Sequence, residues 1–182
     1  MNQVSLYNKI FMGGLFLLAS YALIQFHNFM DGYEVGIFIS SIFVFSWLVF
    51  SWTNFNNFFV TIFLLSFLSI FLYQGNLLIV EESFLLKYFL SSQSAIMWMS
   101  ALYPLSLIIY WVHLFNSQEF SGKLASSLVW IATTLGTAGL LIRWYESYLI
   151  NIDIGHIPIS NLYEVFVLFC IITALIYMYY EE

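Results

Sequence analysis

The chain has 182 residues, of which 62% are apolar, 21% are aromatic and only 8% are charged, with a formal net charge of −6. A soluble domain carries about 25% charged residues because its surface faces water, so this composition excludes a soluble globular domain, and its apolar content excludes intrinsic disorder. Four basic residues are too few for a nucleic-acid-binding surface. Because each membrane span needs roughly 20 apolar residues, the length predicts an all-α polytopic integral membrane protein with about six transmembrane helices.

The first three apolar runs predict membrane-spanning helices near residues 10–26, 35–52 and 58–73. Lys9 precedes the first run, as a basic residue does in a signal peptide. The run extends to Phe26 and further spans follow it, which favours a retained first helix.

The longest connection lies between residues 74 and 93, where Glu81, Glu82 and Lys87 interrupt apolar residues. Phe84, Leu85, Tyr88 and Phe89 have the i, i+1, i+4, i+5 spacing that places side chains on one face of a helix. We therefore expect a short amphipathic helix that lies at the membrane interface.

The last three apolar runs predict spans near residues 94–115, 124–142 and 162–180. The fifth run is the richest in small residues, which let helix backbones approach closely in a bilayer, so we expect it to be the central helix. Arg143 is expected to end this run. The pattern contains no internal repeat and no soluble segment, so residues 1–182 are expected to form a single transmembrane domain.

The basic residues do not settle the orientation by number, because Lys9 and Lys123 fall on one side of the predicted topology and Lys87 and Arg143 on the other. The positive-inside rule counts basic residues near the span ends. Arg143 is close enough in sequence to pair with Glu146, which weakens it as a topological signal. We therefore expect a cytoplasmic N-terminus in the inner (cytoplasmic) membrane, and an even number of spans returns the C-terminus to the same side.

Signatures of soluble enzymes, such as a P-loop or a nucleophile elbow, are absent, and no catalytic residue or metal site is predicted. The most prominent polar segment precedes the last span. There, His156 offers an imidazole for a metal or for haem iron, with Asn161, Tyr163 and Glu164 as polar support. The alternative interpretation is that Asn161 caps the last helix and Glu164 completes a capping box. Both interpretations can hold together.

A second cluster follows the fifth run. The Arg143 guanidinium could bind a propionate or another carboxylate beside the aromatic side chain of Trp144. The alternative is an interfacial anchor in which Arg143 pairs with Glu146.

Two further histidines are weaker candidates. His27 lies near Asp31 and Glu34, which predicts either a small polar site or a solvated turn. His113 lies near the end of a predicted span, where an imidazole is a candidate functional group but can also bond across helices or reach the interface.

The segment 155–164, Gly-His-Ile-Pro-Ile-Ser-Asn-Leu-Tyr-Glu, resembles the Gly-His-x-Pro-x-Ser-Asn-x-Tyr-Glu segment of a known family. This family is the ResC/CcsA-type haem-handling membrane proteins of System II cytochrome c maturation, often labelled CcsB in bacteria. Segments 30–34, 89–100 and 143–148 are also similar and occur in the family's order, so the resemblance extends over nearly the whole chain.

The resemblance implies a membrane component of cytochrome c biogenesis that delivers haem to the outer face of the membrane. The implied partners are a ResB-type membrane protein and apocytochrome c, and the implied cofactor is haem. The family's Trp-rich segment and its best-known haem-ligand histidines have no counterpart in residues 1–182. The chain therefore resembles the N-terminal half of the family, as a fragment, a split-gene product or a truncated copy, and alone it is expected to bind haem weakly or not at all and not to be catalytic.

Two other functions remain open from the residues alone. One is a small transporter or channel subunit with polar residues around a midplane cavity, and the other is a structural membrane subunit without a ligand. The concentration of polar residues near the span ends argues against a midplane cavity.

Overall fold

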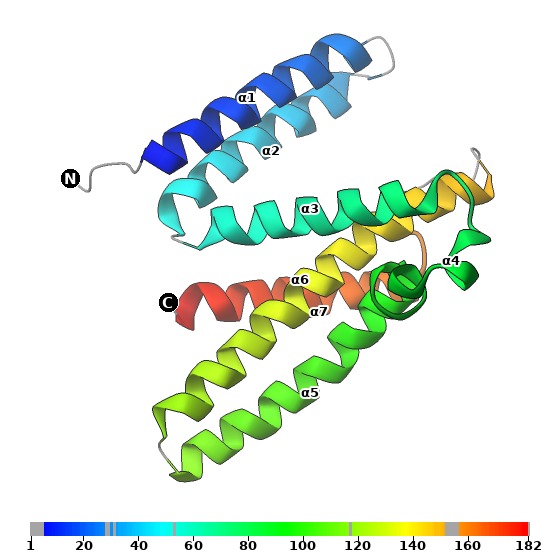
Figure 1. The fold of residues 1–182 in the computed structure, drawn as a ribbon. Helices are drawn as coiled ribbons and strands as arrows, with labels where there is room; N and C mark the ends of the chain where they lie inside the picture. Colours follow the sequence, from blue (N-terminus) through cyan, green and yellow to red (C-terminus); the bar gives the residue numbers. More distant parts are fainter. Residues whose placement is uncertain are drawn as a thin grey trace. The chain divides into compact units, whose positions relative to one another are not determined.

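The computed structural model describes residues 6–27, 30, 32–52, 54–116, 118–151 and 157–181, and within these ranges it contains helices and no strand (Figure 1). The helices are α1 (Leu6–Phe26), α2 (Gly32–Ser51), α3 (Phe55–Tyr73), α4 (Ile79–Glu82), the π-helical turn η2 (Leu86–Leu90), α5 (Ser92–Asn116), α6 (Glu119–Ile150) and α7 (Leu162–Glu181). This confirms the all-α prediction.

The described helices have the lengths and composition of membrane spans. Five of them, α1, α3, α5, α6 and α7, are long and apolar enough to cross a membrane, and α2 contributes a shorter apolar stretch, Val35–Ser51. Their bounds lie within a few residues of the predicted spans except at the end of α6. The chain is therefore a multi-pass membrane protein.

The chain divides into two compact units, Met1–Phe59 and Val60–Glu182. That the whole chain acts as one transmembrane domain stays a prediction. In the first unit, α1 and α2 pack with the first turn of α3 through aromatic side chains: Phe59 lies 5.8 Å from Phe11 and 5.2 Å from Phe45, measured between ring centroids. The buried Asn56 adds a hydrogen bond of 2.8 Å from its Nδ2 to Asn8 Oδ1.

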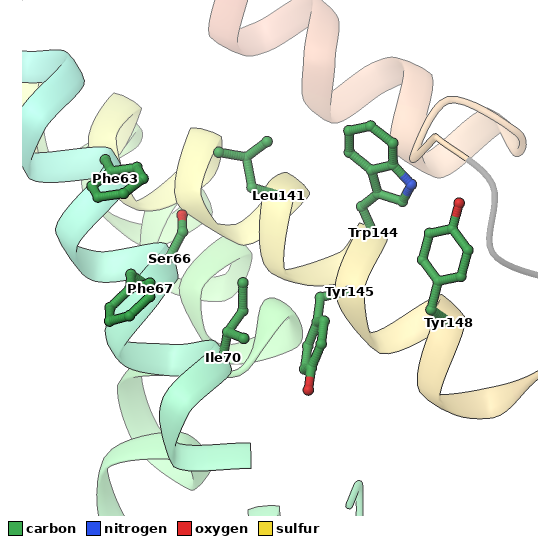
Figure 2. A pocket seen from close by; sticks show the side chains of 8 residues that line it. All are labelled: Phe63, Ser66, Phe67, Ile70, Leu141, Trp144, Tyr145 and Tyr148. Atoms are coloured by element: carbon green, nitrogen blue, oxygen red, sulfur yellow. The ribbon is translucent and has the colours of Figure 1, made fainter. Parts of the chain in front are cut away.

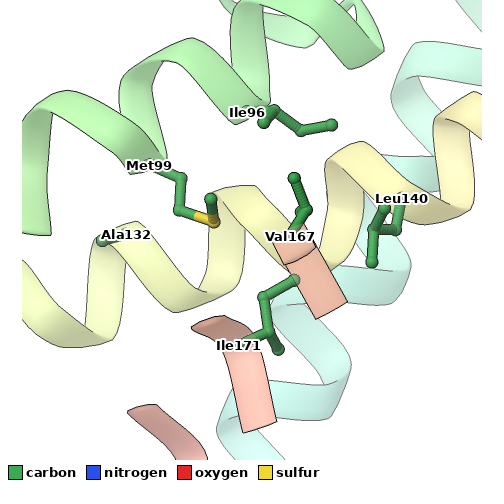
Figure 3. Close-up of a cluster of buried hydrophobic side chains, with 6 residues drawn as sticks. All are labelled: Ile96, Met99, Ala132, Leu140, Val167 and Ile171. Atoms are coloured by element: carbon green, nitrogen blue, oxygen red, sulfur yellow. The ribbon is translucent and has the colours of Figure 1, made fainter. Parts of the chain in front are cut away.

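The core of the second unit lies where α6 packs against both α5 and α7 (Figure 3). It contains Ile96 and Met99 from α5, Ala132 and Leu140 from α6, and Val167 and Ile171 from α7. Small residues on α6 allow this contact. A Cβ atom added at Gly136 would lie 2.3 Å from Met99 Sδ, and one added at Gly139 would lie 2.9 Å from Ile96 Cγ1. The prediction that the fifth span is a central, closely packed helix is confirmed within this unit.

The helix of the fifth run is longer than the apolar run itself and does not end at Arg143. α6 has 32 residues and continues to Ile150, and Asn151 follows it in an extended conformation (φ −162°, ψ 142°). Residues 143–150 contain neither glycine nor proline, so the end of the apolar run is not a helix-breaking signal. At about 1.5 Å per residue, α6 is roughly 48 Å long. It therefore exceeds the roughly 30 Å hydrocarbon thickness of a membrane.

The segment predicted as one interfacial helix divides into two short helical pieces, α4 and η2. The division falls at Ser83, which is extended (φ −90°, ψ 114°). The predicted apolar face does form, because Phe84, Leu85, Tyr88 and Phe89 are all exposed, whereas Leu86 and Leu90 are buried. Hydrogen bonds from Ser69 Oγ to Leu90 O (2.7 Å) and from Trp98 Nε1 to Tyr88 O (2.7 Å) fix η2 against α3 and α5.

Candidate functional site

The candidate site is a set of polar side chains where α6 ends and α7 begins, and all of them belong to the second unit. We call it the Arg143 cluster, and its members are Arg143, Glu146, Glu164, Tyr73 and Ser92. Arg143 Nη1 lies 3.8 Å from Glu146 Oε2, and Arg143 Nε lies 3.4 Å from Glu164 Oε1. One guanidinium is therefore shared by two carboxyl groups, one from α6 and one from α7.

Glu146 accepts more hydrogen bonds than the other carboxyl group of the cluster, and the residue is only 7% exposed. Its Oε1 accepts hydrogen bonds from the Ser92 backbone N–H (2.9 Å) and from the Tyr73 hydroxyl, and its Oε2 accepts one from the Ser92 hydroxyl. Ser92 begins α5, and the first N–H groups of a helix lack partners within the helix and favour a negative charge. Glu146 thus joins the last residue of α3 and the first residue of α5 to α6.

Glu164 is the second buried carboxyl group, at 4% exposure. Its backbone N–H donates to Asn161 Oδ1 (2.9 Å), while its Oε2 accepts from the Ser160 N–H (3.1 Å) and the Ser160 hydroxyl (3.2 Å). The predicted cap is confirmed, since α7 begins at Leu162 directly after Asn161. In a standard capping box, the side chain at the third helical position accepts from the backbone N–H of the N-cap residue. Here the Glu164 carboxyl group accepts instead from the N–H of Ser160, the residue before the N-cap Asn161.

These contacts explain how two carboxyl groups are tolerated in a buried position. Burying a charged group is costly unless hydrogen bonds and an opposite charge compensate it, and both carboxyl groups have these partners. Two further ion pairs among the described residues involve lysines and are exposed: Lys87 with Glu81 (2.9 Å) and Lys123 with Glu119 (3.7 Å). The Arg143 side chain stays 43% exposed, so the cluster presents a fixed guanidinium to the surface.

The aromatic residues that follow Arg143 on α6 line a groove of about 330 Å³ between α3 and α6 (Figure 2). Trp144, Tyr145 and Tyr148 contribute from α6, opposite apolar side chains of α3 that include Phe67 and Ile70. Trp144 is 37% exposed. The aromatic wall predicted beside Arg143 is therefore one side of this groove.

The structure brings together only some of the predicted site residues. Arg143, Glu164 and Asn161 belong to one network of contacts, whereas Tyr163 is exposed. His156 lies outside the described residues. Among the described residues, no group of three or more His, Cys, Asp or Glu side chains is arranged to hold a metal ion.

The weaker candidate histidines lie elsewhere. His113 Nδ1 lies 2.8 Å from Gln118 O and 3.1 Å from Ser121 Oγ, so it contacts the N-cap residue and the first turn of α6. His27 is exposed at the end of α1. Asp31 and the side chain of Glu34, its predicted companions, lie outside the described part of the chain.

Two members of the cluster, Ser92 and Tyr73, were missed by sequence reasoning. Ser92 stands among serines just before a long apolar run, which is a typical helix-start pattern and could have marked it. Tyr73 ends an apolar run and gives no such signal. Glu146 was predicted only as a partner of Arg143, and its burial against α3 and α5 was not foreseen.

Comparisons of the chain with protein-family models, with curated proteins and with solved structures find no match. The site is therefore interpreted from its geometry and from the motifs of the sequence.

The capping role of Asn161 predicts a measurable loss of stability. Replacing it with alanine leaves the Glu164 N–H without its acceptor, and we expect the free energy of unfolding in detergent micelles to fall by about 1 kcal/mol. Asn161→Ser keeps a capping oxygen and is expected to lose much less. Equal stability of the alanine variant and the wild type would contradict the capping role.

Proposed function

We propose that this chain is a membrane component of cytochrome c biogenesis, which takes part in delivering haem to apocytochrome c and attaching it at the outer face of the membrane. The proposal rests on the resemblance of four segments to ResC/CcsA-type proteins. The observation that supports it is that three of these segments contribute to the Arg143 cluster. Ser92, from segment 89–100, bonds to Glu146, which is 54 positions away in segment 143–148. Arg143, from the same segment, pairs with Glu164, which is 21 positions away in segment 155–164.

In this proposal, Arg143 is first of all a positioning residue. Its guanidinium is already shared by two carboxyl groups, so its main effect is to hold the start of α7, close in sequence to His156. His156 would supply an imidazole to haem, and Trp144 would supply an aromatic surface for the macrocycle. Asn161, Tyr163 and Glu164 would support this end of α7.

Within the second unit, the described histidine His113 does not fit as a second imidazole ligand next to the cluster. His113 contacts Ser121 in the first turn of α6, about 33 Å along the helix from Arg143 at 1.5 Å per residue. Haem binding by residues 1–182 alone is therefore expected to be weak, and chemistry at the vinyl groups requires further residues. A ResB-type partner and the family's downstream half would supply them.

The proposed location is the inner (cytoplasmic) membrane with a cytoplasmic N-terminus. Single cysteines at positions 119 and 159, in a Cys170→Ala background, test this because both native side chains are exposed. Glu119 begins α6, and Ile159 lies in the connection from α6 to α7. We expect a membrane-impermeant thiol reagent to label position 159 from outside and position 119 only from the cytoplasmic side. The reverse pattern would contradict the orientation, and labelling of both from one side would contradict the spanning of α6.

Cytochrome assembly in cells tests the function. Residues 1–182 would be expressed with a ResB-type protein and an apocytochrome in a strain that lacks its own maturation system. Covalent haem staining is expected only when the family's downstream half is supplied in trans. No staining in that complete combination, with all proteins present in the membrane, would contradict the function. Staining without the downstream half would contradict the expected need for it.

A further inference from the structure

A second groove lies in the same unit, between α5, α6 and α7, away from the Arg143 cluster. Its volume is about 510 Å³, within the range of roughly 300–1,000 Å³ typical of ligand sites. Its walls are mainly apolar and include Leu107, Val129, Phe169 and Ala174. The groove therefore provides an apolar channel along the side of the helices.

Two tyrosines that line this groove both bond to a neighbouring carboxylate, that of Glu181. The rings of Tyr110 and Tyr177 lie 5.9 Å apart with an interplanar angle of 80°, and both residues line the groove. Their hydroxyls donate to Glu181 Oε1 at 2.6 and 2.8 Å, and the Ser126 hydroxyl donates to Glu181 Oε2 at 2.8 Å. A carboxylate has about four acceptor positions, so one position, on Oε2, remains for a further donor.

Within the second unit, no described lysine or arginine side chain forms an ion pair with Glu181. Lys87 and Lys123 pair with Glu81 and Glu119, and Arg143 pairs within its own cluster. A carboxylate beside two aromatic rings is suited to an ammonium group, which gains from hydrogen bonding to the carboxylate and from the ring faces. The Glu181 carboxylate beside the groove is therefore complementary to a cation.

We propose that this groove binds a phospholipid with a primary ammonium headgroup. An acyl chain lies along the apolar wall, and the ammonium donates to Glu181 Oε2 beside Tyr110 and Tyr177. Glu181 is the last residue of α7, so the headgroup sits where a span reaches the interface, at the depth that tyrosines prefer. A quaternary ammonium lacks the N–H that this bond requires.

The length of the groove favours a lipid chain over a partner helix. Along α7 it extends from Phe169 to Tyr177, which is about 12 Å at 1.5 Å per residue. A transmembrane helix of a partner would run along roughly 30 Å of hydrocarbon and would contact the groove over less than half of its span.

Native mass spectrometry of the delipidated chain in detergent tests the proposal. The added lipids are phosphatidylethanolamine, phosphatidylcholine and phosphatidylglycerol with identical acyl chains. We expect phosphatidylethanolamine to bind roughly tenfold more tightly than the other two, a difference of about 1.4 kcal/mol. Glu181→Gln should bring the three affinities close together. Glu119→Gln is the matched control, because Glu119 is exposed and begins α6, the helix whose Ser126 bonds to Glu181. This control should keep the preference for phosphatidylethanolamine.

A second variant tests the groove itself. Cys170 is exposed and lines it, so Cys170→Phe should fill it and weaken binding of all three lipids at an unchanged melting temperature. Equal affinities of the three lipids for the wild type, or a full preference for phosphatidylethanolamine in Glu181→Gln, would overturn the proposal. A dimer that Cys170→Phe abolishes, without any lipid preference, would assign the groove to a second copy and would also overturn it.

Discussion

Replacing Glu146 with alanine is expected to lower the free energy of unfolding by about 3–5 kcal/mol, the cost of removing one partner from a buried charged network. The substitution leaves the Ser92 N–H, the Ser92 hydroxyl and the Tyr73 hydroxyl without their shared acceptor. Unsatisfied buried donors cost about 1–3 kcal/mol each, and Arg143 also loses one of its two carboxyl partners. Unfolding of the purified protein in detergent micelles measures the loss.

Two further variants separate this effect from a general effect of removing an acidic side chain. Glu146→Gln keeps one acceptor oxygen and should lose clearly less stability than Glu146→Ala. Glu82 is exposed on α4, and Glu82→Ala should change stability by at most about 0.5 kcal/mol. If Glu146→Ala were as stable as Glu82→Ala, the buried network would not hold these helix ends together.

Gly139→Ala is expected to destabilise the second unit by about 1–3 kcal/mol, because it overpacks a close helix contact. The new Cβ would lie 2.9 Å from Ile96 Cγ1, 3.3 Å from Ala95 Cβ and 3.4 Å from the backbone oxygen of Ser92. Ile96 is β-branched and has few alternative rotamers, so α5 and α6 must move apart. A fall in the melting temperature in detergent is the expected result.

Two other glycines provide matched controls for this substitution. At Gly136 the nearest atom to a new Cβ is Met99 Sδ, and a flexible methionine can move aside, so Gly136→Ala should cost less than Gly139→Ala. At Gly13 nothing lies within 4 Å of the new atom, so Gly13→Ala should be neutral or slightly stabilising. The opposite order of the three variants would refute the close packing at Gly139.

Sequence features that act locally predicted the structure well. The lengths of the apolar runs predicted the spans, and the small residues of the fifth run predicted the helix that packs between α5 and α7 in the second unit. Asn161 and Glu164, spaced three residues apart, predicted the start of α7. These signals depend on residues close together in the chain, and distant contacts do not easily override them.

The features that could not be predicted are the length of α6, which hydropathy does not report, and the contacts between residues far apart in the sequence. Arg143 ends the apolar run but not the helix, since hydropathy reports the membrane boundary and not the hydrogen bonding of the backbone. The pairing of Arg143 with Glu146 was accessible because they lie one turn apart. Its contact with Glu164, and the burial of Glu146 against Tyr73 and Ser92, arise only when the four helix ends come together.

Covalent haem staining of cytochrome c in cells with Glu164→Gln tests the central claim most directly. The assay includes the ResB-type partner and the downstream half supplied in trans, with immunoblots that show equal amounts of each variant in the membrane. Glu164→Gln keeps the size of the side chain and its acceptor for Ser160, but it removes the charge that pairs with Arg143. We predict that it lowers the haem-stained cytochrome at least several-fold, while Glu119→Gln leaves it at the wild-type level. Wild-type staining with Glu164→Gln would contradict the claim that the Arg143 cluster serves cytochrome assembly.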